Sequence, residues 1–228
     1  MNTLLTLGCS LAPRGPMFWP ATVGELFDKH DHYNFGGGGN QMLLDCIDEY
    51  LLTHSADNLT ILYQMTGMTR GGGLYEIAQD LSQPVKGANN PQGRWDDWNG
   101  VFGKQYMIWT DKHPIVKNEI KNPTTMITRV VSKLCLLARA GIQVYTFRGW
   151  SGILENDTYS RNKSDYKWKQ IENIFNQNNV NHIDEPYVDW CVKNNKEFID
   201  DWHPKAFSSC DYANEVIIPL INKRKDIK

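Results

Sequence analysis

The sequence lacks the features of membrane, nucleic-acid-binding and disulfide-rich proteins. No apolar run approaches the ~18–20 residues of a membrane-spanning helix. The 24 Lys and Arg against 26 Asp and Glu leave no basic excess for binding nucleic acid or a membrane surface. Its five cysteines show no CxxC spacing, which favours free thiols in a reducing compartment over disulfides or a zinc site.

An export signal is also not evident. Met1–Cys9 ends in a Gly-Cys pair as lipoprotein signals do, but no Lys or Arg precedes Arg14, and its apolar stretch is about half of a usual signal core. We expect this segment to be the first strand of a soluble protein that is cytoplasmic by synthesis. The 228 residues, with 8 Trp, 10 Tyr and 8 Phe, are enough to bury a large core without a metal or a disulfide.

Strand and helix patterns alternate along most of the chain. Apolar runs predict strands at Thr3–Leu7, Tyr33–Phe35, Leu59–Met65, Ile142–Phe147 and Val180–Ile183. Helical spacing predicts helices at about Pro20–Lys29, from Asn40 to Leu51, Pro123–Ala140, Ser164–Phe175 and Lys205–Ile221. In the last of these, Phe207 is expected to face inward, and Pro219 is expected to kink or shorten the helix. Because parallel strands need crossover connections, this order predicts an α/β fold with a mostly parallel sheet between two helical layers.

One region breaks the alternation. Residues 82–122 are rich in Gly and Pro and contain Trp95, Trp98 and Trp109. We predict a single domain over 1–228 that carries this Trp-rich insertion as a lid or substrate-facing segment, with an Ω-like loop packed on its own backbone as the alternative. Trp95 and Trp98 are candidates for stacking on sugar rings.

Three polar segments follow strands or precede a helix, where an open parallel sheet places its active site. Gly8-Cys9-Ser10 follows the first strand and offers a hydroxyl on a tight turn. The glycines of Asn34–Asn40 allow close backbone approach, and the helix after them favours a developing negative charge. Asp200-Asp201-Trp202-His203-Pro204 pairs a carboxylate with an imidazole. Together they supply a nucleophile, a base and an orienting carboxylate, the minimum for acyl transfer.

These segments resemble the sequence blocks of the SGNH (GDSL-type) hydrolases, a superfamily with a flavodoxin-like three-layer α/β/α fold. The resemblance implies that Ser10 is the nucleophile, that His203 is the base oriented by Asp200, and that the N–H groups of Ser10 and Gly39 belong to the oxyanion hole. Cys9 departs from the usual acidic residue of the first block. The short run Gly8-Cys9-Ser10 with Trp19-Pro20 further resembles a divergent branch associated with bacteriophages.

The third block differs from the family pattern Gly-x-Asn-Asp. The chain has Thr66-Gly67-Met68-Thr69-Arg70 there, without an asparagine. We interpret Met68 as its replacement, and a thioether cannot donate a hydrogen bond. Thr66, Thr69 or Arg70 is expected to substitute, with Thr66 in the oxyanion hole and Arg70 at the substrate. Losing one such donor typically lowers the rate about 10²–10³-fold.

The sequence therefore favours a serine esterase acting on a small acyl ester, with O-acetylated carbohydrate as the substrate class. No metal or organic cofactor is implied, and neither nucleic acid nor a membrane is expected as a partner. A non-catalytic carbohydrate-binding or virion-associated structural protein is the alternative, motivated by Met68. Acyl transfer to a sugar hydroxyl is a third option with the same residues.

Three other groups have ordinary structural interpretations. Cys9 is expected to be a buried core residue rather than a thiol nucleophile. His30 and His32, with Asp28 and Asp31, are expected at a solvated helix end rather than around a metal. His182 with Asp184 is expected in a surface turn, with substrate contact as the alternative.

Overall fold

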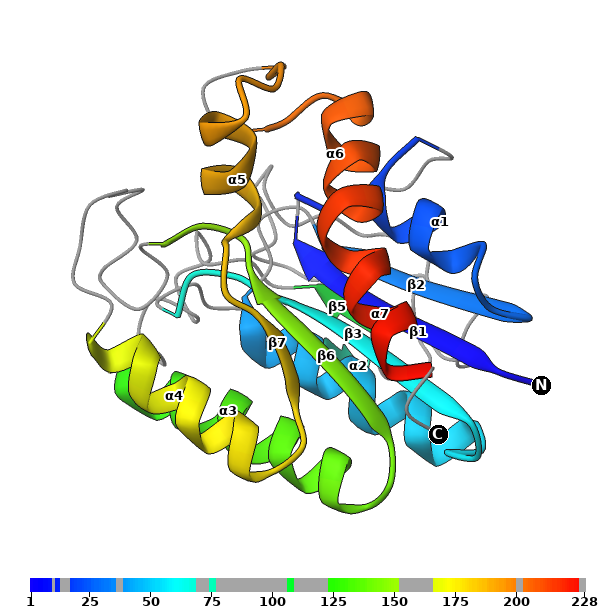
Figure 1. The fold of residues 1–228 in the computed structure, drawn as a ribbon. Coiled ribbons are helices and arrows are strands. Elements are labelled where there is room, and N and C mark those ends of the chain that lie inside the picture. Colours follow the sequence, from blue (N-terminus) through cyan, green and yellow to red (C-terminus); the bar gives the residue numbers. More distant parts are fainter. Residues whose placement is uncertain are drawn as a thin grey trace, which may run out of the picture.

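A five-stranded sheet forms the centre of the computed structural model (Figure 1). The model describes residues 1–9, 11–12, 17–35, 39–68, 74–76, 106–108, 123–151, 166–199 and 203–225. All pairings in this sheet are parallel, and the strand order is β2-β1-β3-β6-β7. The strands are β1 (Thr3–Cys9), β2 (Lys29–Phe35), β3 (Leu59–Met65), β6 (Gln143–Arg148) and β7 (Asn181–Ile183). The predicted α/β class and the parallel sheet are confirmed.

Helices cover both faces of the sheet, as Figure 1 shows. One layer contains α2 (Asn40–Thr53), α3 (Pro123–Arg139) and α4 (Tyr166–Gln177), in which α3 packs against both neighbours. The other layer contains α1 (Trp19–Gly24), α5 (Tyr187–Lys193), α6 (Ala206–Tyr212), a π-helical turn at Ala213–Ile217 and α7 (Ile218–Lys225). Within it, α6 packs against α1 and α5. None of the helices in the described ranges is long and apolar enough to cross a membrane.

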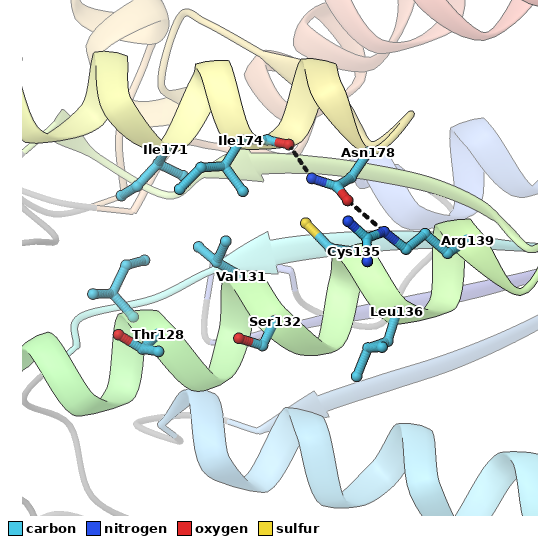
Figure 2. Close-up of a pocket in the computed structure, with 10 residues that line it drawn as sticks. Thr128, Val131, Ser132, Cys135, Leu136, Arg139, Ile171, Ile174 and Asn178 are labelled. Atoms are coloured by element: carbon cyan, nitrogen blue, oxygen red, sulfur yellow. Dashed lines mark hydrogen bonds between the residues drawn. The ribbon is translucent and has the colours of Figure 1, made fainter.

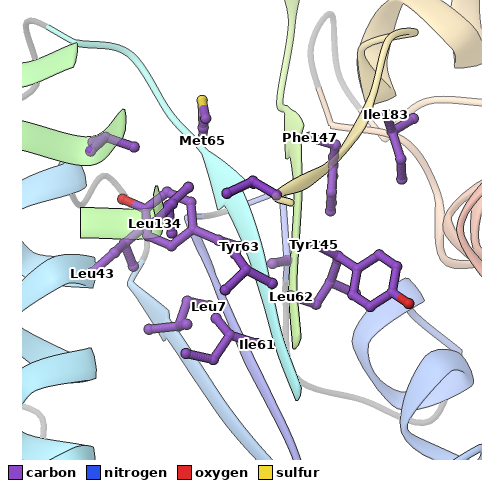
Figure 3. Close-up of a cluster of buried hydrophobic side chains, with 14 of the residues drawn as sticks. Leu7, Leu43, Ile61, Leu62, Tyr63, Met65, Leu134, Tyr145, Phe147 and Ile183 are labelled. Atoms are coloured by element: carbon purple, nitrogen blue, oxygen red, sulfur yellow. The ribbon is translucent and has the colours of Figure 1, made fainter. Parts of the chain in front are cut away.

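The core consists of two apolar layers, one on each face of the sheet (Figure 3). On one face, Tyr63 lies beside Leu43 of α2 and Leu134 of α3. On the other, Trp19 packs edge-on against Phe147 with ring centroids 5.1 Å apart. The polar residues that reach the carboxyl edge of the sheet therefore emerge from an otherwise apolar interior.

The strand β2 is longer than predicted and corrects the placement of two histidines. It begins at Lys29, so His30 and His32 lie in a strand and not at a helix end. Their side chains alternate with those of Asp31 and Tyr33 because successive residues of a strand face opposite sides. The helix α1 is correspondingly shorter than predicted and ends at Gly24.

The C-terminal helical segment also differs from the prediction. Pro219 neither ends it nor prevents α7 from continuing to Lys225. The π-helical turn ends at Ile217, two residues before this proline, and Ile218 N–H donates to the carbonyl of Ala213, five residues back. Phe207, expected inward, is 69% exposed, because Ser208 and Ser209 occupy the buried side of α6.

Three further elements were not predicted. The short helix α5 follows β7, and the strands β4 (Leu74–Glu76) and β5 (Tyr106–Ile108) form an antiparallel pair. Apart from β5, the predicted insertion at 82–122 lies outside the described residues.

Candidate active site

The strand order reverses between β1 and β3, which marks the carboxyl ends of these two strands as the expected place of a site. From β1 the chain crosses to β2 on one side, whereas β3 lies on its other side and leads to β6 and β7. In open α/β sheets, ligands bind at such a reversal of strand order. The chain segments after Cys9 and after Met65 therefore border the expected site.

The backbone on both sides of Ser10 is held by hydrogen bonds. Ser10 itself lies outside the described residues. Before it, Cys9 N–H donates to Gln64 Oε1 at 3.2 Å, and after it, Ala12 N–H donates to the Cys9 carbonyl at 2.8 Å. The Leu11 carbonyl accepts from Trp19 Nε1 at 3.0 Å. We call residues 9–12, closed by the Ala12–Cys9 hydrogen bond, the Ser10 turn.

Two side chains of β2 hold the far end of the Ser10 turn. His32 Nε2 donates to the Ala12 carbonyl at 2.9 Å, and Asn34 Nδ2 donates to the same oxygen. Gly8 makes this arrangement possible, since a Cβ atom there would collide with Ala12 Cβ and lie 2.7 Å from Gln64 Oε1. The turn is thus tied to both strands that flank β1.

The start of α2 is tied to the end of β3 through Asn40. Its Oδ1 accepts from Thr66 N–H at 3.2 Å, and its Nδ2 donates to the Thr66 carbonyl at 2.8 Å. Gly39, the N-cap residue, has an extended backbone and no side chain to cap the helix. Since no acidic residue stands in the first turn of α2, its positive dipole end is not neutralised there. Gly39 and Thr66, both predicted for the oxyanion hole, are therefore brought together.

Two buried polar atoms at this edge of the sheet have no hydrogen-bond partner among the residues that the structure describes. They are Thr66 Oγ1 and Gln64 Nε2, and both side chains are fully buried. Such groups are costly in a folded protein and call for an explanation, for example a ligand that supplies the missing partner. A hydroxyl of this kind can donate to a substrate oxygen without first breaking another bond.

His203 lies at the base of a hairpin between α5 and α6. Phe198 bridges Pro204, Ile199 N–H donates to the His203 carbonyl at 2.8 Å, and Lys205 N–H donates to the Glu197 carbonyl at 2.8 Å. The His203 residue is half-buried. Asp200, three residues before His203 in the sequence, lies outside the described residues.

The segments that carry Ser10 and His203 meet through Trp19. Its backbone N–H donates to Ser209 Oγ at 2.8 Å, while its indole donates to Leu11. Thr22 Oγ1 adds a 3.2 Å contact to Cys210 Sγ. One residue therefore joins the Ser10 turn to the helix that begins three residues after His203.

Comparison with known proteins bears on the fold. No protein-family model and no curated protein matches the chain. A member of the lipolytic protein G-D-S-L family from Veillonella parvula superposes with a TM-score of 0.54, at 12% identity over 94% of this chain and 97% of that one. The psychrotrophic esterase EstA from Pseudoalteromonas sp., in a structure inhibited by monoethylphosphonate, gives 0.54 at 13% identity, over 99% and 100%. The chain has the SGNH-hydrolase fold. The family resemblance found in the sequence is thereby confirmed at the level of the fold.

Within this SGNH fold, the interpretation of Met68 needs correction. Its side chain is fully buried, and its Sδ accepts from Asn40 Nδ2 at 3.4 Å, so it belongs to the core. Counting Gly-x-Asn-Asp from Gly67 places Thr69 at the asparagine position, and Thr69 lies outside the described residues. Met68 therefore gives no argument for a non-catalytic protein.

Arg70, Trp95 and Trp98 also lie outside the described residues, as do Ser10 and Asp200. Two residues that support this candidate site, His32 and Gln64, were not predicted from the sequence as parts of it, whereas Asn34 and Asn40 bounded the predicted glycine segment without a predicted role for their side chains. Gln64 had a detectable signal, because it is the one amide in the apolar strand β3. His32 and Asn34 share one face of β2, but this alternation is visible only once the strand is known to begin at Lys29.

Cys9 is buried as predicted, with its thiol 3.6 Å from Gln64 Oε1.

His182 lies in β7, with Nε2 2.8 Å from Asp184 Oδ1, and is not in the surface turn expected for it. The ligand atoms of His182 and Asp184 and a carboxylate oxygen of Glu172 lie within 4.8 Å of one another, so these three residues could hold a metal ion. Because the Asp184 side chain is 80% exposed and already pairs with His182, we assign no ion to them.

A groove of about 520 Å³ lies away from this site, between α3 and α4 (Figure 2). It is mostly apolar and closed at one end by Arg139, whose Nε donates to Asn178 Oδ1 at 2.6 Å. Burial raises the pKa of the Cys135 thiol, which makes it a poor nucleophile. The described residues that line the groove include no carboxylate or imidazole to act as a base. We assign it no chemistry.

Proposed function

We propose that the protein is an SGNH-type serine esterase that hydrolyses a small acyl ester, with O-acetyl groups on a carbohydrate as the substrate class. Ser10 attacks the ester carbonyl while His203 takes its proton, and Asp200 stabilises the imidazolium. His203 then returns the proton to the leaving alcohol, and water, activated by the same imidazole, releases the acid from the acyl-enzyme.

The observation that carries this proposal is the support of the Ser10 turn. Gln64 accepts a hydrogen bond from the backbone before Ser10, and Trp19 and His32 donate to the backbone after it, at the carboxyl end of β1. A nucleophile benefits from such fixation, because a displacement of about 1 Å can lower a rate about 10²-fold. A turn that served only to connect two elements would not need side chains from three other elements to bind its backbone.

The oxyanion is stabilised in this proposal by the N–H groups of Ser10 and Gly39 and by the hydroxyl of Thr66. Support comes from the link between Gly39 and Thr66 through Asn40, and from the absence of any partner for Thr66 Oγ1. Donors fixed before the reaction stabilise developing charge without reorganisation. Arg70, Trp95 and Trp98 are proposed to contact the alcohol part of the substrate.

The test compares two serines that each follow a parallel strand. Purified protein should hydrolyse p-nitrophenyl acetate, and Ser10→Ala should lower kcat roughly 10⁴–10⁶-fold. Ser151→Ala is the matched control: its hydroxyl donates to Asp189 Oδ1 at 2.8 Å, so we expect lower stability with unchanged turnover. A fluorophosphonate probe should modify Ser10, as identified by peptide mass spectrometry. An unlabelled protein with no esterase activity, or an active Ser10→Ala variant, would contradict the proposal.

A further inference from the structure

A chain of three polar side chains ends at the Ser10 turn. His30 Nε2 lies 2.8 Å from Thr6 Oγ1, which lies 2.7 Å from His32 Nδ1. The other ring nitrogen of His32 reaches the Ala12 carbonyl. Thr6 is fully buried in β1, and the two histidines are half-buried in β2. The proposed chemistry assigns no role to any of these three residues.

The Ala12 carbonyl determines the direction of these hydrogen bonds. A carbonyl oxygen only accepts, so His32 Nε2 carries a proton. When His32 is neutral, its Nδ1 is therefore an acceptor, and the Thr6 hydroxyl donates to it. The hydroxyl then accepts from His30 Nε2–H. One direction thus runs through the whole chain, from His30 to Thr6, His32 and Ala12.

The outer end of the chain is fixed by packing. Gly24, the last residue of α1, lies so close to the His30 imidazole that an added Cβ atom would collide with Nδ1. Burial lowers the pKa of His30, with Asp31 opposing this effect in part, so the neutral form is favoured. A histidine held on both sides in this way keeps the Thr6 hydroxyl directed at His32.

We propose that His32 is a positioning residue for the Ser10 turn, oriented by Thr6 and His30. This inference rests on the proposed function, because its consequence is the placement of the Ser10 nucleophile. Asn34 donates to the same carbonyl, so the loss of His32 leaves the turn held by one side chain of β2 instead of two. We expect kcat to fall about 10–100-fold with KM nearly unchanged.

Two amide substitutions separate the two hydrogen bonds of His32. In His32→Gln the amide nitrogen reaches about as far as Nε2 and can still donate to Ala12. In His32→Asn the amide oxygen lies near the Nδ1 position and can accept from Thr6, but the shorter side chain does not reach Ala12, which keeps only its bond from Asn34. We expect kcat of the Gln variant within about threefold of the wild type and the larger loss for the Asn variant. His54→Gln, at the far end of α2, controls for a histidine change elsewhere.

Labelling by the fluorophosphonate probe distinguishes the two possible failures. If the wild type is labelled at Ser10 but both variants react at the wild-type rate, or lose reactivity equally, the positioning role of His32 is wrong. If the wild type is not labelled, the proposed function itself fails.

An NMR measurement tests the hydrogen bonds from His30 through Thr6 and His32 to Ala12 independently of enzyme activity. At about pH 8, where histidine is neutral, nitrogen–proton correlations should show His32 protonated on Nε2, and the Ala12 amide should exchange at least about tenfold faster in His32→Asn than in His32→Gln. A proton on Nδ1, or equal exchange in both variants, would overturn the inference.

Discussion

The two Gly-x-Ser segments of this protein follow parallel strands but have different surroundings. Gly8-Cys9-Ser10 follows β1, and Gly149-Trp150-Ser151 follows β6. At the second segment, Asp189 accepts from both the N–H and the hydroxyl of Ser151, at 2.9 and 2.8 Å. At the first, side chains from β2, β3 and α1 hold the backbone on either side of the serine.

The difference shows what makes a serine a candidate nucleophile. A hydroxyl bound directly to a carboxylate has its proton engaged, so Ser151 ties the end of β6 to the start of α5. The hydrogen bonds near Ser10 are made by the main chain of its neighbours. Position after a strand is therefore insufficient, and the partners of the surrounding backbone decide between the two serines.

After the loss of Ser10 itself, the largest effect is expected for the buried threonines near the two segments. Thr66 and Thr146 are both fully buried, but Thr146 Oγ1 donates to the Tyr63 carbonyl at 2.9 Å, whereas Thr66 Oγ1 has no partner. Thr66→Val should lower kcat about 10²–10³-fold, since an oxyanion donor is lost, and leave stability unchanged or higher. Thr146→Val should cost about 1 kcal/mol of unfolding free energy and keep turnover.

Esterase kinetics measure kcat of the Thr66→Val and Thr146→Val variants, and urea unfolding measures their stability. Thr66→Ser serves as the control, because it keeps the hydroxyl and should retain most activity. A Thr66→Val enzyme with wild-type kcat would remove Thr66 from the oxyanion hole.

The next largest effect is expected for the two glycines. In Gly8→Ala the new methyl group would meet Ala12 and Gln64, at 2.7 Å from the Gln64 oxygen, so the Ser10 turn must shift. In Gly149→Ala the nearest atoms, Leu11 Cδ1 and the Met65 carbonyl, are 3.2 Å away. We expect Gly8→Ala to lower the unfolding free energy by about 1–3 kcal/mol and to abolish esterase activity. Gly149→Ala should have a smaller effect on stability and on activity. If both variants lose the same unfolding free energy in chemical denaturation, the segment after β1 is no more tightly packed than the segment after β6.

The smallest effect is a pH dependence of the unfolding free energy that arises from His30 in β2. Burial lowers the pKa of His30, so the unfolded chain binds this proton more readily than the folded protein. The unfolding free energy should therefore fall as the pH drops below about 6.5 and level off below the folded pKa. His30→Gln should flatten this slope in urea titrations between about pH 7 and 5. A slope identical to that of the wild type would exclude His30 as its source.

The sequence predicted the architecture wherever a local pattern matched its final surroundings. The apolar run of β3 and the long amphipathic helix α3 have the expected positions, and Gly141 at φ +93° follows α3 as a glycine stop should. β2 was mostly missed because His30, Asp31 and His32 do not look like a strand until they pair with β1. The helix α5 is only seven residues long and leaves too little periodicity to detect.

For the site, the sequence could identify the polar segments but not what supports them. Ser10, Gly39 and His203 stood out through their positions after strands or before helices. The partners of the Ser10 turn come from distant residues, such as Gln64 for Cys9 and His32 for Ala12. Such pairings depend on strand order and register, which local patterns do not encode.

The contact of Trp19 with Ser209 has a consequence for biosynthesis. Because the chain emerges from the ribosome amino end first, β1 and α1 are made long before the helix they need. The segment around Ser10 can reach its final state only after some 190 further residues have been translated. A nascent chain arrested before α6 should therefore contain Ser10 and still lack the esterase activity proposed for the protein.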